Sequence, residues 1–147
     1  MKKTAIYATS GLQNTLRIET QIEFCKTQLK ANDEYVTYSD NGYSTNDKER
    51  PAFNEMMSAI ENDEIDVVIV YDISRICRDI RSFCEFSNTL YEHNVTLISA
   101  INGFNSSSDY GRTLLQLLLV FCENERKNHS ERCRRGWALR KQRKEEF

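Results

Sequence analysis

Short apolar segments alternate along this chain with longer segments in which apolar side chains recur every three or four positions. Three of the short segments are rich in β-branched residues, and a fourth alternates more weakly between apolar and polar side chains, which is typical of strands. The predicted strands are KTAIYA (3–8), EYVTYSD (34–40), DVVIVYD (66–72) and VTLISAI (95–101).

Each predicted strand is followed by a pattern that predicts a helix. After the first three strands apolar side chains fall at helical spacing, and Pro51 is suited to the first turn of the second helix. The side chains concerned are Leu16 or Ile18, Ile22, Cys25 and Leu29; Phe53, Met56, Met57 and Ile60; and Ile80, Phe83, Cys84, Leu90 and Tyr91. This alternation predicts an α/β domain with a mainly parallel sheet, helices on both faces, and ligands at the carboxyl ends of strands.

The last predicted element is one long helix from about residue 110 to about residue 141, which no proline interrupts. At ~1.5 Å per residue it is ~45 Å long, more than a small domain can cover. Its first half is apolar on all sides and its second half is charged, so we expect a second subunit to cover the apolar half. Residues 1–109 are predicted to form the core, and residues 110–147 the long helix and a basic arm of the same domain.

Length and composition indicate one globular domain. The longest apolar run, LLQLLLVFC (114–122), is shorter than the roughly 20 residues that span a bilayer, and the amino terminus lacks the apolar segment of a signal peptide. We therefore expect a cytoplasmic protein. Five cysteines, with no CxxC pair and no His/Cys cluster at metal-ligand spacing, predict reduced and mostly buried thiols.

Charge is unevenly distributed, although the net charge is only −2. Residues 126–147 hold nine Lys and Arg against three Glu, whereas residues 1–125 hold eleven Lys and Arg against nineteen Asp and Glu. A basic arm on an acidic body points to a polyanionic partner, although such a tail is as often a solvated helix face.

Two arginines directly beyond the third strand are candidates for phosphate chemistry. Arg75 and Arg78 are three residues apart, so that both guanidiniums face the same way on a helical turn. Such a pair suits the oxygens of a phosphate, both in its ground state and in the more charged transition state of phosphoryl transfer. The alternative is that both are surface arginines paired with Asp79 and Glu85.

Two hydroxyls and a loop arginine are further candidates. Thr9 and Ser10 stand where the first strand passes into a helix, and they either act chemically or hydrogen-bond the turn. Arg50 ends the glycine- and serine-bearing loop DNGYSTNDKER and could reach an anion from there.

Five motifs in this order resemble the catalytic domain of the serine recombinases, the family of resolvases, invertases and large serine integrases. The motifs are IY.....LQ...I..Q, DNGYS......RPAF, DVVIVYDISRICRD, GR..L.....F.E.ER.N.SER and RRG. The resemblance implies a DNA strand-transfer enzyme in which a serine hydroxyl attacks the scissile phosphate, forms a 5′-phosphoserine link and frees a 3′-hydroxyl. It implies no metal and no nucleotide cofactor, because the covalent link retains the phosphodiester energy.

The resemblance also assigns roles to residues of this chain. Arg75 and Arg78 match the arginines of the family's (D/S)RLxR motif, and Arg50 matches the arginine before Pro-Ala-Phe. The implied catalytic residues are Ser10, Thr9, Gln21, Arg50, Arg75 and Arg78. The residues implied to contact DNA are Glu131, Arg132, Arg134, Arg135, Arg140 and Lys141, whereas Arg126 is expected to hold the dimer or the sheet face. Without the resemblance, the Glu-Arg pairs of this helix are equally explained as salt bridges along a solvated face.

The opening motif departs from the family pattern Y-x-R-x-S-T, because no arginine follows Tyr7 at the expected place. Ser10 is the expected nucleophile, and Thr9 is the poorer alternative because its β-methyl group crowds attack. Two functions stay open: an active recombinase domain, and a recombinase-like protein without catalysis that dimerises and binds DNA or a partner recombinase. A nucleotide-binding domain is disfavoured, because no glycine-rich phosphate loop follows a strand.

The partners implied by the resemblance are DNA and further copies of the chain, as a homodimer and as a tetramer in the synaptic complex, with no membrane. Residues 110–147 would be the helix that dimerises and contacts DNA. Family members continue beyond this helix into a DNA-reading domain, and the sequence leaves open whether this chain is part of a longer protein.

Overall fold

The computed structural model describes residues 3–11, 15–43, 49–77, 79–101 and 103–145. Its strands are β1 (Lys3–Ser10), β2 (Glu34–Asn41), β3 (Val67–Val70), β4 (Thr96–Ser99) and β5 (Phe104–Asn105). Its helices are α1 (Thr15–Lys26), α2 (Pro51–Glu61), the single turn η1 (Ile73–Arg75), α3 (Ile80–Glu92) and α4 (Asp109–Glu145). Each strand and helix predicted from the sequence is present. The sequence pattern does not predict β5, because two residues are too few to show a period.

A five-stranded sheet with the order β2-β1-β3-β4-β5 forms the centre of the domain. The first four strands are parallel, whereas β5 runs antiparallel to β4. β1 is flanked on both sides, so that Tyr7 lies opposite Tyr38 of β2 and Val70 of β3. The predicted α/β class with a mainly parallel sheet is confirmed, and the carboxyl ends of β1, β2 and β3 lie at one edge.

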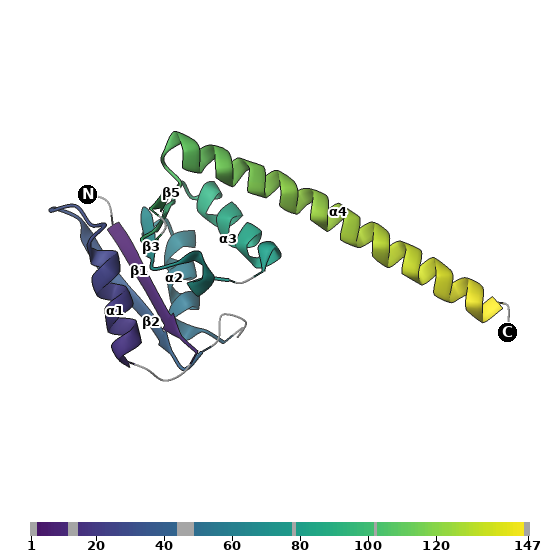
Figure 1. Cartoon of the computed structure of the whole chain (residues 1–147), viewed down its shortest axis with the longest axis horizontal. Helices are drawn as coiled ribbons and strands as arrows, with labels where there is room; N and C mark the ends of the chain where they lie inside the picture. Colours follow the sequence, from purple (N-terminus) through teal and green to yellow (C-terminus); the bar gives the residue numbers. More distant parts are fainter. Residues whose placement is uncertain (1–2, 12–14, 44–48, 78, 102, 146–147) are drawn as a thin grey trace.

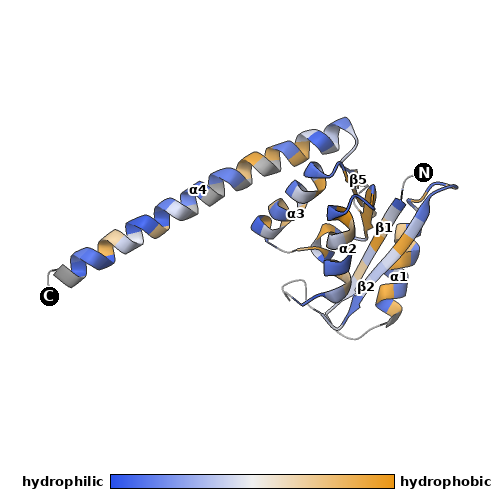
Figure 2. Ribbon diagram, turned by 180° about the vertical axis from the view of Figure 1, so that it is seen from behind, coloured by the Kyte–Doolittle hydropathy of each residue, from blue (hydrophilic) through white to orange (hydrophobic). Residues whose placement is uncertain are grey.

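Helices cover both faces of this sheet, with α1 on one face and α2 and α3 on the other (Figure 1). On the α1 face, Ile6 and Ile69 pack with Cys25 of α1. On the other face, Tyr7 packs with residues of α2 and α3, including Phe86. Successive side chains of β1 therefore enter opposite cores, as the alternation of a strand requires. Figure 2 shows this distribution, with hydrophobic residues in the sheet and hydrophilic residues along much of the far half of α4.

The helix α4 begins beside the sheet and then leaves the body of the domain (Figure 1). Near its start it packs against α3 and β5, and Leu115 contacts the larger core cluster. Gly111 permits this close approach, because a Cβ atom there would collide with the carbonyl oxygen of Asn105. Farther along, Leu117 and Phe121 are exposed, at 63% and 49%. Among the described residues no helix is long and apolar enough to cross a membrane.

Among the cysteines whose side chains the structure describes, Cys84 differs from the expectation of reduced thiols. Cys84 of α3 is disulfide-bonded, so the prediction was wrong for this residue. Cys25 and Cys77 form no disulfide and are buried, and Cys133 forms no disulfide and is exposed. The state of a thiol depends on which second cysteine the fold brings close, and spacing along the chain does not show this.

Candidate active site

The two hydroxyls at the end of β1 lie on opposite faces of the sheet. Alternation along the strand places Thr9 on the face of Tyr7, with α2, and Ser10 on the face of Ile6, with α1. Both residues are buried, at 2% and 0% exposure. The hydroxyl of Thr9 donates to a main-chain carbonyl of the β2 end, that of Asp40, at 3.1 Å. In this conformation neither predicted nucleophile is open to solvent.

Gln21 of α1 holds the end of β1 through its main chain. Its Nε2 donates to the carbonyl oxygen of Thr9 at 3.0 Å, and the amide of Thr9 donates back to its Oε1 at 3.3 Å. The side chain is buried, at 3% exposure. This predicted catalytic residue therefore lies beside the hydroxyls, and the hydrogen bonds described for its side-chain amide go to the main chain of β1.

Asp40 at the end of β2 is a residue that the sequence analysis missed. Its carboxylate accepts hydrogen bonds from the Tyr7 hydroxyl at 2.8 Å, the Ala52 amide at 2.9 Å and the Phe53 amide at 3.0 Å. Burial, followed by the bond to Asp40, raises the pKa of Tyr7, so the phenol stays protonated and acts as the donor. No local pattern in the sequence marks this role, because the two α2 amides lie 12 and 13 residues farther along the chain.

Arg50 lies directly before α2 and is buried, at 7% exposure. Its guanidinium carbon lies 3.9 Å from the centre of the Phe53 ring, a cation–π contact. One of its nitrogens, Nη1, donates to the carbonyl oxygen of Arg75 at 3.5 Å, at the long end of the hydrogen-bond range. The side chain of the loop arginine therefore reaches the main chain of the first arginine beyond β3.

Arg75 ends the turn η1 and is half-buried. Its Nε is buried and has no hydrogen-bond partner within the part of the chain that the structure describes. The salt bridges of the described residues do not include Arg75, and Asp79 caps α3 by accepting from the Ser82 amide. Arg78, the second arginine of the pair, lies outside the described residues.

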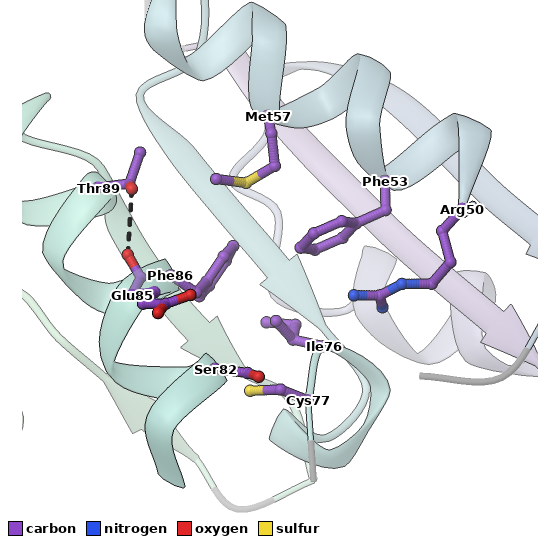
Figure 3. Close-up of a pocket in the computed structure, with 9 residues that line it drawn as sticks. All are labelled: Arg50, Phe53, Met57, Ile76, Cys77, Ser82, Glu85, Phe86 and Thr89. Carbon is purple, nitrogen blue, oxygen red and sulfur yellow. Dashed lines mark hydrogen bonds between the residues drawn. The ribbon is translucent and has the colours of Figure 1, made fainter. Parts of the chain in front are cut away.

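A pocket of about 220 Å³ opens between α2 and α3, with Arg50 at its edge (Figure 3). The other residues around it are mostly apolar: Phe53, Met57, Ile76, Cys77, Ser82, Glu85, Phe86 and Thr89. Burial raises the pKa of the Cys77 thiol to about 12, so this thiol is neutral near pH 7 in the wall of the pocket. Across the described ranges no three His, Cys, Asp or Glu side chains converge to hold a metal ion.

The predicted DNA-contacting residues lie apart from this edge of the sheet. They are exposed and sit on the half of α4 that projects from the body (Figure 1): Glu131, Arg132, Arg134, Arg135, Arg140 and Lys141. The side chain of Arg126 lies outside what the structure describes. The chain therefore carries two separate cationic regions, one at the carboxyl ends of the strands and one along the projecting helix.

Comparison with known proteins gives a family match that covers both the sheet edge and the projecting helix. The family model "Resolvase, N terminal domain" matches residues 6–146. A relative from Bacillus subtilis (strain 168) is 30% identical over 119 residues, which make up 81% of this chain and 23% of that protein. The transposon Tn917 resolvase of Enterococcus faecalis is 30% identical over 89 residues, 60% of this chain and 47% of that protein. The chain thus spans less than half the length of either curated relative.

Solved structures agree with the family match. The crystal structure of the N-terminal catalytic domain of TP901-1 integrase has a TM-score of 0.76 at 29% identity, over 87% of this chain and 99% of that one. A resolvase family site-specific recombinase from Streptococcus pneumoniae has a TM-score of 0.70 at 25% identity, over 95% of this chain and 98% of that one. The chain therefore belongs to the resolvase N-terminal domain family, the catalytic domain of the serine recombinases.

Proposed function

We propose that this chain cleaves and rejoins DNA strands at specific sites through a phosphoserine link formed on Ser10. The observation that carries the proposal is the arrangement of hydroxyls and guanidiniums at one edge of the sheet. Thr9 and Ser10 end β1, while the guanidinium of Arg50 reaches the main-chain carbonyl of Arg75 beyond β3. Ligands of α/β domains bind at this edge, and guanidiniums match the oxygens of a phosphate.

In the proposed reaction the Ser10 oxygen attacks the scissile phosphorus, and the bond from phosphorus to the 3′ oxygen breaks. The serine proton is given up to a base or to water, and the leaving 3′ oxygen takes up a proton. Arg50 and Arg75, with Arg78, stabilise the charge that develops on the phosphate oxygens. Rejoining is the reverse, because a 3′-hydroxyl attacks the phosphoserine and releases the serine.

Ser10 must become accessible before it can attack. It is fully buried in the described conformation. The next residue, Gly11, is exposed, and apart from its chain neighbours no described residue has an atom within 4 Å of the place where a Cβ would lie. Ser10 also lies on the α1 face, whereas Arg50 lies over Phe53 on the α2 face. We therefore propose that the end of β1 opens and turns Ser10 toward Arg50 when DNA is bound. Thr9 is the alternative nucleophile: it shares the sheet face of Tyr7 and α2, although its hydroxyl is occupied by main-chain carbonyls in this conformation.

The proposed partners are DNA and further copies of the chain. The basic half of α4 supplies exposed cations for phosphates, and its apolar half leaves Leu117, Val120 and Phe121 exposed in a single chain. Spacing of three and four residues puts these side chains on one stripe of the helix. We propose that a second copy covers this stripe in a homodimer, and that two dimers form a tetramer in the synaptic complex.

Covalent trapping tests the proposal. The chain, fused to a sequence-specific DNA-binding domain, is incubated with that domain's site carrying a nick that prevents religation, and the phosphorylated residue is located by mass spectrometry. We expect an adduct on Ser10 that is lost in Ser10→Ala and in Arg75→Ala. An adduct on Thr9 would transfer the role of nucleophile to that residue. If no adduct forms although folding and DNA binding are intact, the chain is the recombinase-like protein without catalysis.

A further inference from the structure

We propose that Asp40 is a positioning residue, which holds Arg50 at the phosphate site by capping α2 from the end of β2. The inference rests on the proposed strand-transfer function and adds a residue to it. Asp40 is not a candidate from the sequence patterns. Its carboxylate is buried, at 2% exposure, and is surrounded by donors of this chain.

The amino end of α2 needs a cap that its own residues do not supply. Arg50 occupies the capping position with extended backbone angles, and its side chain makes no capping hydrogen bond. The first amides of a helix are left without partners inside the helix, and a carboxylate near them is favourable for the helix dipole. Asp40 accepts from two of these amides, those of Ala52 and Phe53, with one oxygen each.

This cap comes from a distant strand, so it fixes where α2 begins relative to the sheet. The same carboxylate accepts from the Tyr7 hydroxyl of β1, and the main-chain carbonyl of Asp40 accepts from the Thr9 hydroxyl. The Tyr7 and Phe53 rings also meet edge to face, with centroids 5.3 Å apart. Asp40 is therefore the point at which the hydroxyl-bearing end of β1 is joined to the amino end of α2.

The position of Arg50 depends on this junction. Arg50 precedes the two capped residues, and its guanidinium lies over the ring of Phe53, whose amide Asp40 holds. Figure 3 shows the Arg50 and Phe53 side chains next to each other at the end of α2. When the cap is lost, the first turn of α2 moves, and both the ring and the guanidinium move with it. Misplacement of a catalytic group by about 1 Å can slow a reaction by ~100-fold.

A double-mutant cycle tests this link. In Asp40→Asn the side-chain shape is kept, but the amide nitrogen cannot accept a hydrogen bond, so one α2 amide loses its partner. Adduct formation on the nicked site is measured at saturating DNA for wild type, Asp40→Asn, Arg50→Ala and the double variant, each corrected for its folded fraction. We expect Asp40→Asn to slow the maximal rate by about 10- to 100-fold, with a change in half-saturating DNA concentration of less than about threefold.

The decisive result is non-additivity. If Asp40 acts through Arg50, the double variant is no slower than Arg50→Ala alone, because removal of the guanidinium leaves nothing for the cap to position. A purely structural role gives additive losses, or a rate per folded molecule that does not change, and either result overturns the inference. Ile69→Val, in the opposite core, is the matched control that lowers stability without touching α2. If the wild-type protein forms no adduct, the proposed function itself is contradicted. If the wild type forms the adduct and Asp40→Asn forms it equally fast, only this inference is contradicted.

Discussion

The Tyr7 hydroxyl donates a hydrogen bond of 2.8 Å to the Asp40 carboxylate across two neighbouring strands, and both side chains are buried. Tyr7 lies in the middle of β1 and Asp40 near the end of β2, so the bond runs along the sheet face toward the carboxyl edge. A buried carboxylate is costly unless donors surround it. Here one phenol and two helix amides donate hydrogen bonds to it. The stable placement of α2 therefore depends on this small polar cluster.

Removal of the Tyr7 hydroxyl tests the strength of this bond. In Tyr7→Phe the ring still packs in the core, and the carboxylate keeps its two α2 amides. A hydrogen bond to a charged group contributes about 1.5–3 kcal/mol, so we expect the free energy of unfolding to fall by roughly that amount. Urea unfolding measures it, with Tyr38→Phe on the neighbouring strand as a control that should change little. An unchanged midpoint for Tyr7→Phe would show that the bond contributes nothing.

Gln21 is expected to stabilise the end of β1 through its two bonds to the main chain of Thr9. Gln21→Ala leaves a buried amide and a buried carbonyl without partners, which should cost about 1–3 kcal/mol for each group left unsatisfied. Glu19→Ala, an exposed position of the same helix, is the control and should have little effect. Hydrogen exchange of the Thr9 amide gives a second measurement, because this amide should exchange faster in Gln21→Ala. Equal exchange in both variants would contradict the role given to Gln21.

The order of strands and helices could be read from the sequence, because each element carries its own periodicity. The placement of Thr9 on the same sheet face as Tyr7 follows from the same periodicity, because the two residues are separated by one position in a strand. The role of Asp40 could not be read in this way. It depends on contacts 12, 13 and 33 residues away along the chain, and none of these separations produces a local pattern.

The arginines illustrate the same limit. Spacing identifies Arg75 and Arg78 as candidates, and a place at the end of a loop identifies Arg50. The fold brings the Arg50 side chain to the main-chain carbonyl of Arg75. In the structure the ring of Phe53 lies beneath the Arg50 guanidinium. The sequence shows Phe53 only as one apolar residue of an amphipathic helix. Whether such a residue belongs to the core or supports a site depends on what packs above it, which is a property of the tertiary structure.

Burial of two thiols predicts how stability depends on pH. Desolvation raises the pKa of Cys25 and of Cys77 from 9.0 to about 12, so both thiols are neutral in the folded state. In the unfolded chain they ionise near their ordinary pKa. The stabilisation is therefore complete below pH ~9 and is lost as the pH rises from ~9 toward ~12. Thermal melting across this range should show the decline, and it should be shallower in Cys25→Ala than in wild type.

The same burial predicts selective alkylation in the native protein. Cys133 is exposed and should react with iodoacetamide at pH 8, whereas Cys25 and Cys77 should react only after unfolding. Peptide mass spectrometry locates the labels, and a sample in denaturant shows that all three residues can react. Rapid native labelling of Cys77 would mean that the pocket between α2 and α3 opens readily.

Self-association should depend on the exposed stripe of α4. Leu117 and Val120 are exposed at 63% and 58%, so charged substitutions there disturb an interface without disrupting the core of one chain. We expect wild type to sediment as a dimer at high concentration and Leu117→Lys/Val120→Lys to sediment as a 17.2 kDa monomer. Leu139→Lys, at 59% exposure in the basic half, is the control and should remain dimeric. A wild type that stays monomeric at every concentration would contradict the proposed homodimer.

DNA binding by this chain alone should be weak, insensitive to base sequence and strongly dependent on salt. The cations of α4 are placed to contact phosphates, and each phosphate contact that is removed should flatten the slope of log affinity against log salt by about 0.9. We therefore expect Arg134→Ala/Arg135→Ala to bind less tightly and with a slope smaller by about 1.8.

Fluorescence anisotropy with two unrelated duplexes over a range of salt concentrations measures both quantities. Lys30→Ala, an exposed charge between α1 and β2, is the matched control and should leave affinity and slope unchanged. Binding that prefers one duplex and persists at high salt would mean that base edges are being read by groups other than these phosphate-directed cations. An equal loss in Lys30→Ala and in the α4 variant would mean that the net charge of the chain, and not the projecting helix, determines the affinity.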